Sequence, residues 1–462
     1  MIQRYLRSNA SALLALIGVA AAGAAPTNIV FILADDLGYG DLSCYGQTRF
    51  QTPNLDRMAA EGLRFTQHYA GSTVCAPSRA CLLTGQHTGH VYQRANGNLG
   101  FRPDPLDRCI ASSLKSIGYA TAMIGKSGLA CNSSDAHLPH RKGFDHFFGY
   151  LSHGAAHRYF PKQLFRDGAT VSYPGNHGKH GDTYSGDEFL ADTLSWLRQR
   201  GDEPFFLHLA LQQPHLDLAV PDAWREPFLG KFDETPLKEG HYRAEANPKA
   251  TFAGMVTYLD DTVGKVLAEL KSLGIAEETL VLFSSDNGAV TAAGWSSDNM
   301  NSSGPLRGCK RDLYEGGIRV PTIAWWPGTI EPGRVTDHVS TFWDFAPTAC
   351  ELTGAPPLPA TDGVSYLPTL TGKGEQAEHD HLYWEFHERG GKQAIRMGRW
   401  KGVRLKVQKN PDAALELYDL QADLGETQDV SSAHPAIVRE MERIMRESHV
   451  PTDRHGFGAQ RR

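Results

Sequence analysis

The sequence of 462 residues predicts an α/β fold in two parts. We expect residues 25–353 to form a large domain with a mainly parallel mixed sheet between helices, and residues 354–462 a small α+β domain with an antiparallel sheet. Three observations support this. Several apolar runs lack polar alternation, which is typical of strands covered on both faces. Helical patterns separate those runs. Short alternating segments follow a proline-rich stretch at residues 354–359.

Each element rests on a local pattern. The run NIVFILA at residues 28–34 is a buried strand, and a helix follows from Asn54 because Thr52 can cap it and Pro53 suits its first turn. The same reasoning predicts a helix from Pro77, strands at 118–124, 204–211 and 279–284, and helices at 187–200 and 249–273. The small domain is expected to contain strands at 381–386, 393–397 and 401–407 and a helix at 433–448.

The charge balance argues against a nucleic-acid partner. Lys and Arg number 46, Asp and Glu number 52, and the net charge is −6. Proteins that bind nucleic acids usually carry a basic excess. Any anion site in this chain must therefore be built locally.

Residues 1–24 are expected to be a signal peptide. Arg4 and Arg7 precede an apolar run at residues 12–22, which is too short to span a bilayer, and Ala22-Gly23-Ala24 offers a cleavage site. The alternative is a buried N-terminal helix. A signal peptide implies a periplasmic or secreted protein without stable membrane insertion.

Two predicted strands end in acidic pairs. Asp35-Asp36 follow the first strand, and Asp286-Asn287 follow the strand at 279–284. Ligands of parallel α/β sheets bind at the carboxyl ends of the strands, and close carboxylates repel each other unless a cation lies between them. Oxygen ligands indicate Ca²⁺ or Mg²⁺. The alternative is a pair of turns, which Asp, Asn and Gly favour.

One cysteine has an unusual setting. The chain has seven cysteines, so at least one cannot pair within it. In Cys75-Ala-Pro-Ser-Arg79, the proline suits the first turn of a helix, which places Cys75 at an N-terminus that favours anions. Arg79 can turn back to the same site. The alternative is a structural cysteine in a disulfide.

These residues belong to a larger set of motifs, which resembles the type I sulfatases of the alkaline-phosphatase superfamily. The signature C-x-P-S-R-x-x-L-x-T-G of that family matches residues 75–85. Further matching segments are Asp35-Asp36-Leu-Gly-Tyr-Gly-Asp41, Gly125-Lys126, Gln213-Pro-His215, Asp286-Asn287-Gly288, and Lys310 ahead of Glu315-Gly-Gly-Ile-Arg-Val-Pro321.

The resemblance implies an alkaline-phosphatase-like fold and a role for each matched residue. A maturation enzyme converts Cys75 to Cα-formylglycine, and the hydrated aldehyde attacks the sulfur of a sulfate ester. Arg79, Lys126 and Lys310 compensate the charge of the sulfate, and His215 protonates the leaving oxygen. The implied ligands of one divalent cation, Ca²⁺ rather than Mg²⁺, are Asp35, Asp36, Cys75, Asp286 and Asn287.

The chain departs from the family pattern after the strand at 118–124. The family commonly reads Gly-Lys-Trp-His-Leu-Gly, whereas this chain reads Gly125-Lys-Ser-Gly128-Leu-Ala. The histidine replaced by Gly128 usually contacts the diol, so the release of sulfate lacks its usual base. His153, His157 or a carboxylate of the metal site are the candidate replacements.

A sulfated carbohydrate is the expected substrate, with a sulfated galactose or N-acetylhexosamine as the expected sugar. Sugar hydroxyls suit mixtures of aromatic and hydrogen-bonding side chains in a cleft between domains. Candidates of this kind are His153, His157, Arg158, Tyr159, His381, Trp384, Glu385, His387 and Glu388. Two alternatives stay open: a phosphate mono- or diester hydrolase of the same superfamily, and a non-catalytic binder of sulfated glycans.

Overall fold

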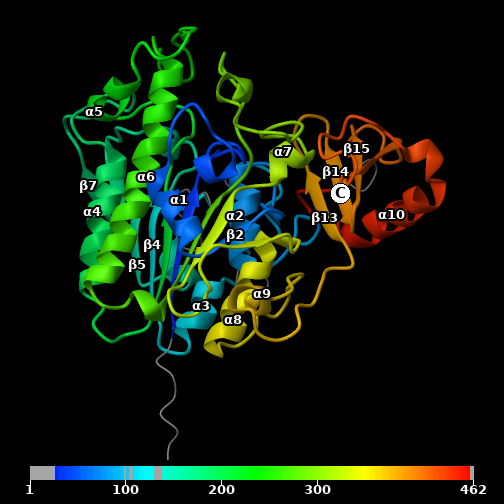
Figure 1. The fold of residues 1–462 in the computed structure, drawn as a ribbon, viewed down its shortest axis with the longest axis horizontal. Coiled ribbons are helices and arrows are strands. Elements are labelled where there is room, and N and C mark those ends of the chain that lie inside the picture. The colour runs from blue at the N-terminus through cyan, green and yellow to red at the C-terminus, as the bar shows by residue number, and fades with distance from the viewer. Residues whose placement is uncertain (1–26, 98–99, 103–107, 129–137, 458–462) are drawn as a thin grey trace, which may run out of the picture.

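A computed structural model describes residues 27–97, 100–102, 108–128 and 138–457. The predicted signal peptide lies outside these residues. The predicted fold class is confirmed, because a large mixed sheet lies between two layers of helices and a small antiparallel sheet stands beside it (Figure 1).

The large sheet has ten strands, of which the five central ones run parallel. In spatial order they are β11 (Arg334–Thr336), β2 (Leu63–Phe65), β10 (Thr322–Trp325), β9 (Thr279–Ser285), β1 (Asn28–Ala34), β8 (Phe205–Ala210), β4 (Ala120–Lys126), β5 (His146–Tyr150), β6 (Gln163–Arg166) and β7 (Ala169–Ser172). The parallel strands are β9, β1, β8, β4 and β5, and antiparallel pairs flank them on both sides. A separate pair joins β3 (His68–Tyr69) to β12 (Ser340–Thr341).

Helices cover both faces of this sheet. One layer comprises α1 (Pro53–Ala60), α4 (Ser185–Arg198) and α6 (Pro248–Ser272), and the other comprises α2 (Cys75–Thr84), α3 (Ile110–Lys115) and α8 (Phe345–Thr353). Short helices α5 (Asp222–Arg225), α7 (Glu315–Ile318) and α9 (Leu367–Thr371) lie in the connections. Along β1, alternate residues belong to the two cores, which explains why this strand is apolar throughout.

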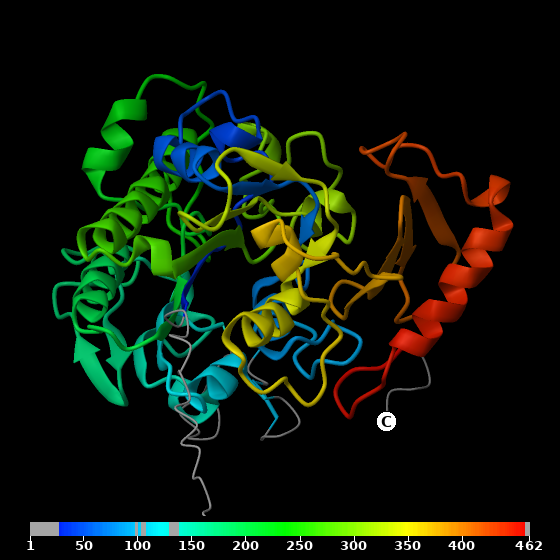
Figure 2. The same cartoon turned by 60° about the horizontal axis from the view of Figure 1, so that its bottom comes forward.

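The small domain is a four-stranded antiparallel sheet covered by one helix. Its strands follow each other in the order β13 (Leu382–Phe386), β14 (Lys392–Met397), β15 (Trp400–Leu405) and β16 (Leu415–Asp419), and α10 (Pro435–Ser448) packs on the outer face (Figure 2). Trp384, Phe386 and Val403 on the inner face join the core of the large domain. Both faces of this sheet are therefore buried.

The element types predicted for both domains are confirmed, with boundaries displaced by a few residues. The cysteines Cys44, Cys75, Cys81, Cys309 and Cys350 are free thiols. Among the described residues, no helix combines the length and the apolar character needed to cross a bilayer.

Candidate active site

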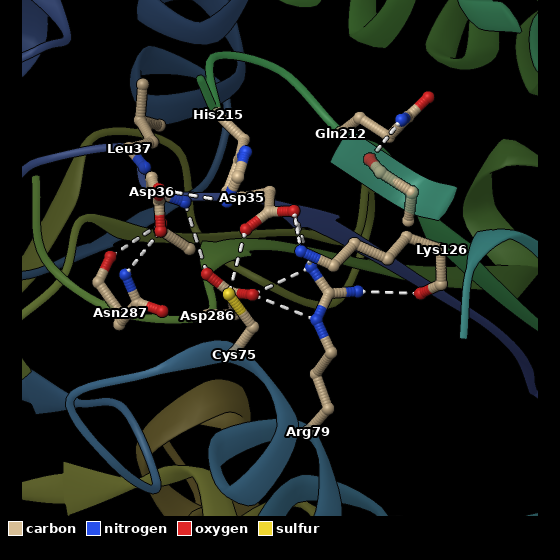
Figure 3. A network of polar contacts seen from close by, with 12 residues as sticks. Asp35, Asp36, Leu37, Cys75, Arg79, Lys126, Gln212, His215, Asp286 and Asn287 are labelled. Carbon is tan, nitrogen blue, oxygen red and sulfur yellow. Dashed lines mark hydrogen bonds and ion pairs between the residues drawn. The ribbon is translucent and has the colours of Figure 1, made fainter. Parts of the chain in front are cut away.

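The carboxyl ends of four parallel strands meet at one point of the large sheet. Because Ala34 and Ser285 are partners in the register of β1 and β9, the acidic pairs that follow these strands lie side by side. The Asp36 N–H donates to Asp286 Oδ1 at 3.2 Å. The loop after β8 carries His215, and β4 ends on Lys126. Figure 3 shows these side chains gathered around Cys75.

Cys75 is the first residue of α2 and is fully buried. Its Sγ lies 3.4 Å from Asp35 Oδ1 and 3.3 Å from Lys310 Nζ. Burial, with the nearby Asp286 and Asp35, raises the pKa of the Cys75 thiol far above its usual value. A protonated thiol is a weak nucleophile. Unmodified Cys75 is therefore poorly suited to attack an ester itself.

Three cations balance the three carboxylates of the site. Arg79 donates to Asp286 Oδ2 through Nε at 2.9 Å, and its Nη2 lies 2.8 Å from the same oxygen. The ammonium groups of Lys126 and Lys310 pair with Asp35 and Asp36 respectively. All six side chains are at most 3% exposed. The repulsion between carboxylates is thus compensated in part by the protein's own cations.

These pairs keep both lysines charged. Burial lowers the pKa of Lys126, but the neighbouring Asp35 raises it, and the net shift is upward. Burial also lowers the pKa of Lys310, but the neighbouring Asp36 raises it, and the net shift is again upward. Two permanent positive charges next to Cys75 suit an anion such as a sulfate group.

His215 faces the carboxylates from the β8 side. Its Nε2 lies 3.5 Å from Asp36 Oδ2, and its Nδ1 contacts the carbonyl of Leu216. Burial, assisted by Lys310 and Lys126, lowers the pKa of His215 well below its usual value, although Asp35 opposes the shift. The imidazole is therefore neutral in the free site.

The donor atoms fit a hard cation. Ligand atoms of Asp35, Asp36, Cys75 and His215 lie within 4.8 Å of one another. Asp36 Oδ2 and Asn287 Oδ1 are buried and have no hydrogen-bond partner among the described residues, which is the state that a bound cation would relieve. Arg79 holds Oδ2 of Asp286, and the role of Asp286 as a ligand of the cation stays a prediction.

Predicted substrate residues fall into two groups. His157 stacks on His215 with ring centroids 4.4 Å apart, and His153 lies 5.2 Å from His157. Burial, followed by Lys126, lowers the pKa of His153 to about 2, so this ring is neutral. Arg158 turns instead to Asp217, with 3.3 Å between Nη1 and Oδ2.

The predicted cluster in the small domain is mostly interior. Trp384 and Glu385 are fully buried, and Glu385 pairs with Arg94 at 2.7 Å. His387 is 8% exposed, its Nε2 lies 2.7 Å from Glu385 Oε1, and its ring stacks on Phe457. These are contacts of a structural side chain, and a substrate role for His387 stays a prediction.

Gly128 lies against Arg79. Its φ is +68°, and a Cβ built on it would be 2.3 Å from Arg79 Cδ. Arg79 is held in this place because its Nη1 also donates to the Lys126 carbonyl at 2.8 Å. The space beside position 128 is therefore filled by the arginine, which leaves no room for a larger residue.

Replacing Gly128 with histidine is expected to lower kcat/KM at least about tenfold, because the new side chain displaces Arg79 from Asp286. The matched control is Gly118→His, since Gly118 also has a positive φ of +91° but no described atom within 4 Å of its Cβ position. Steady-state kinetics of both variants measure the effect. A Gly128→His enzyme more active than the wild type would contradict this account of Arg79.

Comparisons with known proteins agree with this geometry. A family model described as Sulfatase matches residues 27–355, and one described as N-sulphoglucosamine sulphohydrolase, C-terminal, matches residues 309–450. The chain is 35% identical to arylsulfatase A of Homo sapiens, covering 84% of this chain and 77% of that protein. It is 33% identical to N-acetylgalactosamine-6-sulfatase of Homo sapiens, covering 76% and 67%.

A solved structure shares the fold. The structure of Ps i-CgsB in complex with k-i-k-neocarrahexaose has a TM-score of 0.77 and 26% identity, covering 92% of this chain and 94% of that one. The fold and the site thus define a hydrolase of the alkaline-phosphatase superfamily. Within that superfamily, the chain belongs to the type I sulfatase family, and it is a sulfatase.

Proposed function

We propose that this sulfatase removes sulfate from a sulfated carbohydrate, using a formylglycine formed from Cys75 and a Ca²⁺ ion. The observation that carries the proposal is the setting of Cys75, a buried protonated thiol at a helix N-terminus between Lys310 and Asp35. Such a thiol needs modification before it can serve as a nucleophile. The hydrated aldehyde of formylglycine would supply a hydroxyl as the nucleophile.

The chain's own residues have separate roles in this proposal. Lys126, Lys310 and Arg79 hold the sulfate oxygens and compensate their charge. His215 is the proposed proton donor to the oxygen of the departing alcohol, and its imidazole, neutral in the free site, would have to take up that proton in the complex with substrate. The proposed ligands of the cation are Asp35, Asp36, Cys75, Asp286 and Asn287, with His215 close to the same point. A bound divalent cation acts as a Lewis acid and orients the reacting groups.

Relatives and sequence support the proposed carbohydrate substrate and the proposed location outside the cytoplasm. One relative is named for a sulfated sugar, N-acetylgalactosamine-6-sulfatase, and one solved neighbour holds a neocarrahexaose. The predicted signal peptide favours a periplasmic or secreted enzyme. His153, His157, Arg158 and His387 remain the proposed substrate residues, and His153 and His157 the proposed substitutes for the family histidine replaced at Gly128.

The mass of the peptide that contains residue 75 tests the maturation step. Conversion of the thiol to the aldehyde lowers the mass by about 18 Da. The protein should come from a host that has the maturation enzyme, and the same sample should be assayed on sulfate and phosphodiester substrates. Full activity with an unmodified thiol would overturn the mechanism, and a large preference for the phosphodiester would favour the alternative hydrolase. A matured, metal-loaded protein without turnover on any sulfated glycan would favour the binder.

Removal of the cation is expected to reduce both activity and stability. A ligand present at 100 times its Kd stabilises the folded state by about 2.7 kcal/mol, so chelation should lower Tm as well as kcat. Ca²⁺ should restore both more fully than Mg²⁺, because Ca²⁺ accepts many oxygen ligands in flexible arrangements, whereas Mg²⁺ requires a near-ideal octahedron. A chelated sample, shown free of metal by elemental analysis, that retains the Tm and kcat of the original would exclude the metal site.

A further inference from the structure

Four rings from three chain segments gather at one place, and His215 is one of them. His157 comes from the segment after β5, and His241 and Tyr242 come from a loop at residues 238–244. The His157 centroid lies 4.4 Å from that of His215, 6.2 Å from that of His241 and 6.3 Å from that of Tyr242. Tyr242 is also 6.3 Å from His215. The sequence motifs described above lie outside this loop.

A buried carboxylate fixes the loop in this place. Asp217 is 1% exposed, and its Oδ1 accepts the N–H of Arg243. Its Oδ2 pairs with Arg158, whose Nη2 donates to the carbonyl of His241 at 2.8 Å. At the base of the loop, Leu237 and Glu245 form a two-way backbone bridge at 2.8 and 3.1 Å. Asp217 thus connects the strand end that carries His215 to the loop that carries the two rings.

Two of these rings, Tyr242 and His157, lie close to the charged centre and are uncharged. Tyr242 is half-buried, and burial is the main cause of its raised pKa, with Lys310, Asp36 and Cys75 also acting on it. Burial, then His215 and Lys126, lowers the pKa of His157 far below its usual value, so that imidazole is neutral. His157 Nε2 is buried without a hydrogen-bond partner among the described residues.

This combination has a chemical preference. The cations that suit a sulfate group are Lys126, Lys310 and Arg79. Beside His215, the side chains of His157, His241 and Tyr242 present rings with hydrogen-bonding atoms. Rings contact the apolar C–H face of a sugar, and the imidazole and phenol groups can bond its hydroxyls. A neutral polyhydroxyl ring fits this surface better than a second anion.

We propose that His157, His241 and Tyr242 form the site for the alcohol part of the ester, a pyranose ring whose sulfate occupies the cation side. Asp217 and Arg158 are positioning residues that hold the loop against His157. The inference rests on the proposed function, because it takes a sulfated sugar as the substrate. Arg158, proposed above among the substrate residues, thereby affects substrate binding through the loop that it holds.

Separate inhibition by the two products tests the site. The matured, Ca²⁺-loaded enzyme is assayed on N-acetylgalactosamine 6-sulfate and on 4-nitrophenyl sulfate, with N-acetylgalactosamine and inorganic sulfate as inhibitors. In Tyr242→Leu and in His241→Ala we expect KM for the sugar ester and Ki for the free sugar to rise, by about tenfold for the tyrosine. Ki for inorganic sulfate should change by less than about twofold, because the cation side is intact.

The positioning role has its own variants. Asp217→Ala should raise KM and the sugar Ki in the same way, with a smaller effect on kcat, and Asp217→Asn should recover part of the loss because its amide oxygen can still accept the Arg243 N–H. The double variant Asp217→Ala, Tyr242→Leu should have a KM and a sugar Ki close to those of the single variants, since both substitutions act on one surface. The matched control is Asp222→Ala, because Asp222 is 72% exposed in a surface pair with Arg225.

Failure of the proposed substrate class and failure of the alcohol site give different results. A wild-type enzyme that cleaves 4-nitrophenyl sulfate but no sulfated sugar would overturn the proposed substrate class, and the alcohol site with it. A wild-type enzyme that cleaves the sugar ester while Tyr242→Leu, His241→Ala and Asp217→Ala keep its KM and sugar Ki would overturn the alcohol site alone. A rise in the sulfate Ki equal to that in the sugar Ki would show general damage and refute the assignment.

Discussion

A Cys75→Ala variant is expected to lose at least about a thousandfold in kcat/KM on sulfate esters while it keeps its fold. The substitution removes the thiol whose replacement by oxygen turns the Cβ of residue 75 into the aldehyde carbon, so the proposed nucleophile cannot form. The cations around it remain paired with their carboxylates, because Lys126, Arg79 and Lys310 each contact an aspartate directly. Steady-state kinetics and thermal unfolding of the same preparation measure the two parts of the expectation.

The matched control is Cys81→Ala. Cys81 is another buried free thiol on the same helix, and its Sγ contacts the carbonyl of Gly71 at 3.5 Å. It lies outside the group around Asp35 and Asp36, so its loss should change kcat/KM by no more than a few-fold, with a stability cost of about 1 kcal/mol. Near-normal activity of the alanine variant at position 75 would refute the mechanism, whatever the control shows.

The central site could be predicted because residues that directly follow parallel strands lie together at one edge of the sheet. Asp35 and Asp286 are 251 residues apart, yet each directly follows an apolar strand, and parallel strands bring such residues to one edge. The position of Cys75 could be predicted equally well, since the proline two residues later marks the start of its helix. What these residues share is a local signal at the end of a regular element.

Charge pairing inside the site could not be read from the sequence. The carboxylates predicted a cation, but the pairs of Lys126 with Asp35 and Lys310 with Asp36 depend on side-chain directions that only the folded chain defines. The position of the loop at residues 238–244 next to the site could not be predicted for a related reason. Its anchors, Arg158 and Asp217, come from other segments, and no periodic pattern connects them.

The small domain shows that alternating polar residues along a strand do not indicate which face of the strand is exposed to solvent. The short alternating segments predicted an antiparallel sheet, and Glu385 and His387 were candidate contacts of a saccharide. In the structure one face of this sheet packs on α10 and the other on the large domain, so the polar residues are interior. Arg94 and the histidines His387 and His449 satisfy Glu385 there. An interface between domains is a long-range feature, and local alternation cannot distinguish it from solvent.

The same interface leads to the largest expected effect on stability, which is the loss of Lys401. This lysine of β15 is fully buried and pairs with Glu315 of α7 at 2.7 Å and with Glu426 at 3.5 Å. Glu426 in turn accepts the Glu315 N–H at 2.7 Å, so the cluster joins the small domain to the large one. Lys401→Met keeps the volume but leaves two buried carboxylates without their shared cation. We expect the free energy of unfolding to fall by about 3–5 kcal/mol.

The pH dependence of this loss has a definite sign. Burial and the nearby Glu315 raise the pKa of Glu426 to about 7, although Lys401 opposes the shift. A carboxyl whose pKa is higher in the folded state than in the unfolded state makes folding less favourable as pH rises between those two values. Without Lys401 that penalty grows, so the loss in free energy of unfolding caused by Lys401→Met should be larger at pH 8 than at pH 6.

Urea unfolding at both pH values measures this loss. The control is Lys265→Met, because the pair of Lys265 with Asp261 is at the surface and should contribute less than about 1 kcal/mol. Equal stability of the Lys401 variant and the wild type at both pH values would show that the cluster does not hold the two domains together.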